Sequence, residues 1–267
     1  MVTLSPIVRL DVKETHSVLK AVPVELAVVR LQDLVSKHTY KFNKTYDDVI
    51  SVGGLHNFLD FHGCVLLSLI MKDSIIANFD PDKYALAINS LVPDSFTTID
   101  GQTYEGEYSL SMREIERIHA ENKELVRLCP KPQPLGLVKG CTRNQIEHHM
   151  KLLKSLGIEE FVFHIGDFLR HGDPNMISKA RSFSQTIRKE AKRLFLYGMG
   201  SQQKLLEFSF ADVYVSFNHF VTAKNGMRFI GTKKVKYIGS FSSGIVVDNF
   251  IQMYKNVQSI KKQSRLF

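Results

Sequence analysis

Two charged residues stand where short apolar runs of the chain end. The run Ser95–Ile99 ends on Asp100, and the run Leu135–Val138 ends on Lys139 and Gly140. A carboxylate can accept two hydrogen bonds at once, whereas an ammonium group only donates. These residue types could bind a polar ligand that offers both donors and acceptors, and a helix-capping or loop role for Asp100 is the alternative.

Glycine and hydroxyl residues follow two later apolar runs. Gly166 follows Glu160–Ile165, and the lack of a Cβ at this position allows another group to approach the backbone closely. Gly198 and Ser201 follow the next run at a predicted helix start, where free backbone N–H groups can bind phosphate. Both stretches are therefore candidate parts of a binding site.

The last apolar run, Asp212–Phe217, supplies three more candidates. Ser216, Asn218 and His219 lie at its carboxyl end, where a sugar or phosphate could be contacted. The adjacent pair His148 and His149 is predicted to be a surface feature, because neighbouring helical residues point about 100° apart and cannot easily chelate together.

Short β-branched runs alternate with helical segments along the chain, which favours parallel strands joined by crossover helices. We expect eight strands closing one (β/α)8 barrel of the TIM type, whose chemistry lies at the carboxyl ends of the strands. The predicted strands are Val24–Val29, Asp48–Val52, Val65–Ile70, Ser95–Ile99, Leu135–Val138, Glu160–Ile165, Arg193–Tyr197 and Asp212–Phe217.

Amphipathic helices are predicted between these strands. Ser111 followed by Glu114 indicates a capping box at the start of one of them. The predicted helices are Pro81–Val92, Ser111–Leu128, Thr142–Leu156, Pro174–Lys192, Ser201–Ser209 and a last one over Ile245–Lys261. A chain of 267 residues has the size of one such barrel, so we expect a single domain over residues 1–267.

The charge composition of the chain indicates which classes of partner it could bind. The formal net charge is +8 with 35 Lys and Arg residues, which favours an anionic partner such as nucleic acid, although a generic basic surface is the alternative. The basic C-terminal segment 227–267 is open to the same two interpretations, with a solvated face favoured.

The three cysteines form no CxxC pair, and no apolar run is long enough for a leader or a membrane span. We therefore expect a cytoplasmic protein with no metal and no contact with a membrane.

The order and spacing of these strand ends, from about Gly54 to Gly226, resemble the tRNA-guanine transglycosylase superfamily, especially its short zinc-less members that act on DNA. The resemblance implies that Asp100 reads a purine base and that Gly166 offers it a backbone amide. Lys139 and Gly140 stand where the family has a glutamine that faces the base. Because Lys139 can only donate, it would suit a carbonyl, a nitrile or a phosphate.

The resemblance is weaker for the catalytic residues. The family uses an aspartate nucleophile that attacks the sugar C1′ and a second aspartate that manages a proton. Val215 occupies the nucleophile position, and Asp212 matches the aspartate three residues earlier, although a structural role at the start of its strand is favoured for Asp212. The second aspartate opens a turn after the third strand, and there Asp73 and Leu67 compete, with Asp73 favoured because a serine follows it.

Two functions follow as hypotheses. The first is the exchange of guanine for a 7-deazaguanine base in DNA or tRNA, on a flipped-out base and without a cofactor. The catalytic candidates are then Asp73 and Asp212. The second hypothesis is a non-catalytic barrel that serves as the partner subunit of another transglycosylase, in a homo- or hetero-oligomer, or that binds nucleic acid.

Overall fold

A computed structural model describes residues 3–169, 172–200 and 202–263. Eight parallel strands follow one another in chain order in a closed barrel, so the predicted (β/α)8 fold is confirmed. The strands are β1 (Thr3–Val8), β2 (Leu26–Arg30), β3 (Cys64–Ser68), β4 (Ser95–Thr97), β5 (Gln133–Leu137), β6 (Glu160–His164), β7 (Arg193–Tyr197) and β8 (Val213–Ser216).

The chain divides into two compact units, Val28–Val162 on the one hand and Met1–Ala27 with Phe163–Phe267 on the other. The dividing points fall inside β2 and β6.

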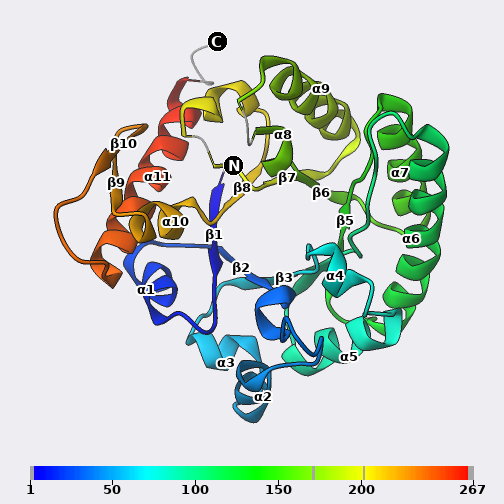
Figure 1. The fold of residues 1–267 in the computed structure, drawn as a ribbon, viewed down its shortest axis with the longest axis horizontal. Coiled ribbons are helices and arrows are strands. Elements are labelled where there is room, and N and C mark those ends of the chain that lie inside the picture. The colour runs from blue at the N-terminus through cyan, green and yellow to red at the C-terminus, as the bar shows by residue number, and fades with distance from the viewer. Residues whose placement is uncertain (1–2, 170–171, 201, 264–267) are drawn as a thin grey trace. The chain divides into compact units, whose positions relative to one another are not determined.

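The central unit, Val28–Val162, pairs β3 with β4, β4 with β5 and β5 with β6 in parallel register. Its long helices α6 and α7 lie side by side outside β5 (Figure 1). Apolar side chains of the strands and helices are buried together, as in Leu66, Phe96 and Ile118. Its helices are η1 (Leu31–Leu34), α2 (Lys44–Ser51), α3 (Leu55–Leu59), α4 (Asp73–Ile76), α5 (Pro81–Leu91), α6 (Tyr108–Leu128) and α7 (Arg143–Ser155).

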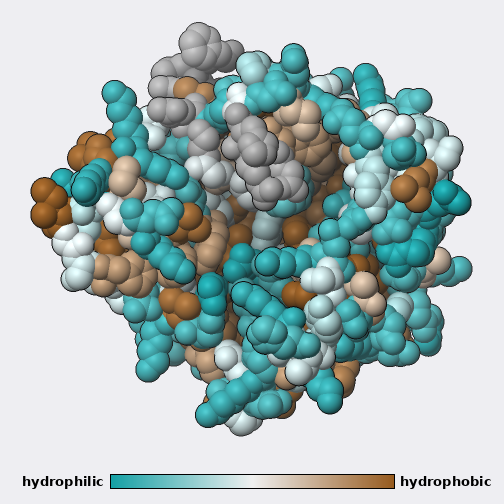
Figure 2. All heavy atoms as spheres, viewed as in Figure 1, coloured by the Kyte–Doolittle hydropathy of each residue, from teal (hydrophilic) through white to brown (hydrophobic). Residues whose placement is uncertain are grey.

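The terminal unit pairs β8 with both β7 and β1. Its last helix packs against α1 and α10. A two-stranded antiparallel hairpin precedes that helix, and Figure 2 shows hydrophobic groups at the left edge, where Figure 1 draws the hairpin. Its elements are α1 (Lys13–Ala21), α8 (Gly166–Leu169), α9 (Pro174–Glu190), η2 (Gln202–Phe208), α10 (Asn218–Lys224), β9 (Met227–Ile230), β10 (Lys233–Lys236) and α11 (Ser243–Gln263).

Three local predictions were wrong. Asp48–Val52 lies largely in α2, because the Asn43 side chain caps that helix by accepting a hydrogen bond from the Tyr46 amide. Ser111 begins no capping box, since α6 starts three residues earlier and the Ser111 hydroxyl accepts from the Tyr104 amide instead. The first strand, β1, was missed because Pro6 lies within it and proline interrupts a strand pattern.

Candidate functional site

Asp100 and Lys139 meet at the carboxyl ends of two neighbouring strands. The Lys139 ammonium donates to Asp100 Oδ1 across 2.8 Å, and both side chains are largely buried, with exposed fractions of 19% and 10%. The Gly101 amide donates to the same oxygen at 2.9 Å. No described residue donates a hydrogen bond to the other oxygen, Oδ2, so the carboxylate retains accepting capacity.

Buried side-chain hydrogen bonds fix the backbone that leads to Asp100. Thr97 Oγ1 accepts from the Leu69 amide and Thr98 Oγ1 accepts from the Leu137 amide, each at 2.8 Å. Asn122 of α6 accepts from the Ile99 amide at 2.8 Å. The carboxylate therefore sits on a backbone tied to both neighbouring strands and to one helix.

A fully buried histidine, His149, accepts a hydrogen bond from the backbone of Lys139. The Lys139 amide donates to His149 Nδ1 at 2.9 Å, which places the ring proton on Nε2. Burial lowers the pKa of His149 to about 3, so the ring stays neutral and can accept this hydrogen bond. The prediction that His149 is a surface residue is therefore wrong, whereas His148 is partly exposed and pairs with Glu116.

The turn after Lys139 requires glycine. Gly140 has a φ of 152°, and a Cβ there would lie 2.9 Å from Gln145 Cβ and 3.0 Å from the Ile146 amide nitrogen. Gln145 also completes a capping box with Thr142 and accepts from the Cys141 amide at 2.8 Å. The start of α7 thus fixes the direction in which Lys139 leaves the strand.

Further ionisable groups surround the pair. Glu114 accepts from the Gln102 amide and pairs with Arg117, which together with the Lys139 charge lowers its pKa. Burial raises the pKa of Tyr84, and the Asp100 charge raises it further, so Tyr84 stays a neutral phenol. The surroundings of the Asp100–Lys139 pair therefore add a second carboxylate, which Arg117 engages, and a neutral phenol.

In the terminal unit, the glycines at the strand ends pack against each other. Gly198 has a φ of 89°, and a Cβ on it would lie 3.0 Å from the Gly166 Cα. A Cβ on Gly166 would lie 2.9 Å from Nε2 of His164. Close packing within the chain therefore accounts for both glycines, without a ligand.

The candidates after β8 are also bonded internally. Ser216 donates to the Met199 carbonyl at 2.8 Å and accepts from the Asn218 amide. The Asn218 side chain donates to the Gly200 carbonyl and accepts from Lys234 at 3.1 Å. Ser201 lies outside the described residues. This network braces the loop after β7 against the hairpin.

His219 is fully buried, next to the rings of Phe217 and Phe250. Neither ring nitrogen has a hydrogen-bond partner among the described residues. Burial lowers its pKa to about 3. The side chain is therefore a neutral core residue here, and it is not presented to a sugar at the surface.

Asp212 lies at the amino end of β8, at the opposite end of the strand from Ser216. Its carboxylate accepts from the Leu194 amide at 2.8 Å and pairs with Arg188. Asp94 does the same before β4, accepting from the Val65 amide at 2.6 Å. Both aspartates thus extend a parallel pair of strands by one hydrogen bond, and this structural role fits Asp212 better than a catalytic one.

The structure also places the remaining candidate catalytic positions, which are Val215, Leu67 and Asp73. Val215 is fully buried within β8, where it pairs with Ser5 and Tyr197. Leu67 is buried inside β3, whereas Asp73 is exposed and opens α4 in the connection after that strand. Asp73 is therefore the catalytic candidate that lies beyond a strand's carboxyl end.

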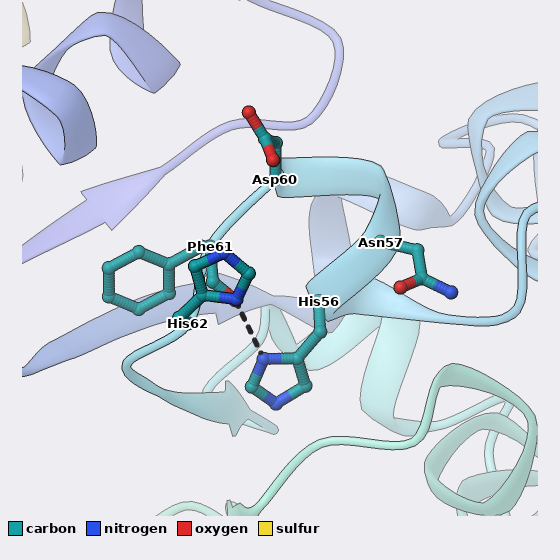
Figure 3. Close-up of a pocket in the computed structure, with 5 residues that line it drawn as sticks. All are labelled: His56, Asn57, Asp60, Phe61 and His62. Atoms are coloured by element: carbon teal, nitrogen blue, oxygen red, sulfur yellow. Dashed lines mark hydrogen bonds between the residues drawn. The ribbon is translucent and has the colours of Figure 1, made fainter.

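A pocket of about 400 Å³ lies beside α3, lined by His56, Asn57, Asp60, Phe61 and His62 (Figure 3). His56 binds the Phe61 carbonyl through Nδ1 and Asp94 through Nε2, at 3.0 and 2.9 Å. Figure 3 shows the Asp60 side chain pointing away from the His56 ring. The pocket therefore adjoins the amino ends of β3 and β4, where the polar groups hold the strands together.

In the part of the chain that the structure describes, no group of three His, Cys, Asp or Glu side chains could hold a metal ion. Across the same residues, no helix combines the length and apolar character needed to cross a membrane. No protein-family model matches the sequence, and no curated protein is significantly similar to it.

Sequence reasoning missed two contributors to the site. His149 recurs on the buried face of α7 with Ile146 and Leu153, and this spacing of three and four residues could have revealed it. Tyr84 shares the buried face of α5 with Ile88 and Leu91 in the same way. Neither pattern indicates which strand end the side chain approaches.

Proposed function

We propose that this protein is a transglycosylase-like barrel that binds a guanine-type base of a nucleic acid at Asp100 and Lys139. The observation that carries the proposal is the 2.8 Å contact between a carboxylate and an ammonium group at adjoining strand ends. Guanine presents two donors, its ring N–H and its amine, beside an acceptor, O6. The free oxygen of Asp100 suits the donors, and the remaining Lys139 protons suit O6.

The exchange of guanine for a 7-deazaguanine base is the reaction we propose for this site. Asp73 would then manage the proton of the incoming base, since it is an exposed carboxylate beyond β3. The net charge of +8 supports a DNA or tRNA substrate rather than a neutral one.

The buried valine at position 215 favours a second candidate function. Valine cannot form a glycosyl ester, and Asp212 is engaged at the amino end of β8. In this alternative the barrel binds the base but serves as the non-catalytic subunit of a transglycosylase whose partner supplies the nucleophile.

One experiment tests recognition and a second separates the two candidates. Calorimetric titration with guanine and 7-deazaguanine should show binding to the wild type, with affinity lost at least about tenfold in Asp100→Asn. The reason is that one acceptor oxygen becomes an NH2 group, which can only donate and would face either the base donors or the Lys139 and Gly101 donors. Unchanged affinity in this variant would remove the proposed function. The exposed Asp82→Asn, on α5, is the matched control.

The second experiment mixes labelled guanine with DNA or tRNA and the purified chain. Label incorporation that Asp73→Asn abolishes supports exchange by this chain. Binding of the base without incorporation, and without a protein–sugar adduct by mass spectrometry, supports the non-catalytic subunit instead.

A further inference from the structure

The hairpin formed by β9 and β10 lies in a stretch of unusual charge. Between Asp212 and Asp248 the sequence contains no Asp or Glu, but it contains five Lys or Arg residues. They are Lys224, Arg228, Lys233, Lys234 and Lys236. Much of the formal net charge of +8 therefore lies on one short segment.

The register of the hairpin sorts its residues onto two faces. Lys234 pairs with Phe229, and Lys236 pairs with Met227. Phe229 is buried, and Lys234 reaches Asn218 at 3.1 Å and lies over the Phe229 ring. Partial burial lowers the pKa of Lys234. The buried Phe229 and the Lys234 contacts hold the hairpin in place, whereas Lys236 on the same face is exposed.

The opposite side, which we name the hairpin face, consists of Arg228, Ile230, Lys233 and Val235, because successive strand residues alternate in direction. Arg228, Ile230 and Lys233 are exposed, and Ile230 retains 54% of its surface in solvent. Arg228 pairs with Val235, and Ile230 pairs with Lys233. Each cation therefore faces an apolar residue on the other strand, and each strand carries one cation and one apolar residue on this face. No described strand extends this two-stranded sheet.

We propose that the hairpin face binds the phosphate backbone of a nucleic-acid strand, together with Lys236, which belongs to the other face but is exposed at the end of β10. The charge is uncompensated within the segment, and two-stranded ribbons of this kind can lie along a groove or backbone. Exposed Ile238 and Phe241 follow β10 and offer apolar surface to bases or sugars. This inference rests on the nucleic-acid substrate of the proposed function but concerns a surface remote in sequence from Asp100.

Alternation of cations with apolar side chains favours nucleic acid over a lipid surface. An interfacial membrane anchor gathers its apolar residues on one side and its cations around them. On the hairpin face each apolar residue instead stands opposite a cation. Binding to anionic lipid vesicles is therefore an outcome that the test must distinguish.

The test compares two triple variants of the full chain for binding to a fluorescent single-stranded oligonucleotide over a range of salt concentrations. The first is Arg228→Gln, Lys233→Gln and Lys236→Gln, which leaves the anchoring Lys234 in place. The control is Lys123→Gln, Lys131→Gln and Lys151→Gln, which removes the same charge from exposed positions of the central unit. Circular dichroism checks that both variants are folded.

For the hairpin variant we expect affinity to fall at least roughly tenfold near physiological salt, and the slope of log K against log salt to shrink by about 2 to 3. The control should bind like the wild type. Equal losses in both variants, no oligonucleotide binding by the wild type, or binding only to phosphatidylserine vesicles would each overturn the inference.

The result is independent of base recognition. A wild type that binds the oligonucleotide through the hairpin but shows no affinity for guanine retains this inference while the proposed function fails. A chain that binds guanine through Asp100 but is unaffected by the hairpin variant gives the opposite result.

Discussion

The strand ends of the two units differ in how far their polar groups are satisfied. At β4 and β5, Asp100 keeps an oxygen without a described donor, and Lys139 gives the one described hydrogen bond of its ammonium to that aspartate. After β7 and β8, Ser216, Asn218 and Lys234 bind one another or backbone carbonyls. Open hydrogen-bonding capacity is what a ligand needs, so this difference supports the proposed recognition at Asp100, whereas the groups after β7 and β8 brace the terminal unit.

Among the described residues, His149 of the central unit and His219 of the terminal unit are fully buried neutral rings, and lowering the pH should destabilise the fold through both. The folded pKa values of His149 and His219 are about 3, below the unfolded value of 6.5, so only the unfolded chain takes up their protons as the pH falls below 6.5. Stability is therefore present above pH 6.5 and lost towards pH 3. From pH 7 to 5 we expect a loss of about 2 kcal/mol per histidine in urea denaturation. The variant His219→Leu should halve the loss, and an unchanged slope would argue against its burial as a neutral ring.

Breaking the charged pair should have the next largest effect. Lys139→Met leaves the largely buried Asp100 carboxylate without its cation, which should lower the free energy of unfolding by about 3 kcal/mol at pH 7. The double variant with Asp100→Leu should recover most of the loss, because a buried pair replaced by apolar residues is often neutral. Additive losses in this double-mutant cycle would show that the pair is not coupled.

The glycine packing in the terminal unit allows a matched comparison. Gly198→Ala places a Cβ 3.0 Å from the Gly166 Cα at a positive φ, so thermal unfolding should show a loss of about 2 kcal/mol. Gly200→Ala, two residues later, meets no atom within 4 Å and should change stability by less than about 0.5 kcal/mol. Similar values for the two variants would contradict the close approach of the glycines.

The smallest predicted effect comes from replacing either buried histidine by leucine. The two substitutions should change the free energy of unfolding in opposite directions. At pH 8, His219→Leu removes two unpartnered nitrogens from an aromatic environment and should be neutral or stabilising by up to about 1 kcal/mol. His149→Leu removes the acceptor of the Lys139 amide and should destabilise by about 1 to 2 kcal/mol. If denaturation curves gave changes in the free energy of unfolding with the same sign for both variants, the two histidines would have the same role.

The sequence by itself determined the barrel fold and the positions of seven of its eight strands, β2 to β8. Alternating apolar runs and helix starts such as Thr142 predicted the barrel, because burial of a parallel sheet and the capping of helices are local in sequence. The patterns also placed Asp100 and Lys139 at strand ends. The same local patterns could not separate Asp48–Val52 from a helix, since a short apolar run suits both.

Only the tertiary structure decided which of these polar residues remain available to a ligand. Asp100 meets Lys139 across 39 residues, Gly166 meets Gly198, and Asn218 meets Lys234. Whether a donor or acceptor is satisfied depends on such distant partners, which local spacing does not encode. For the same reason the sequence ranked Asp212 and His219 among the site candidates, whereas the fold engages one in a strand pairing and buries the other among aromatic rings.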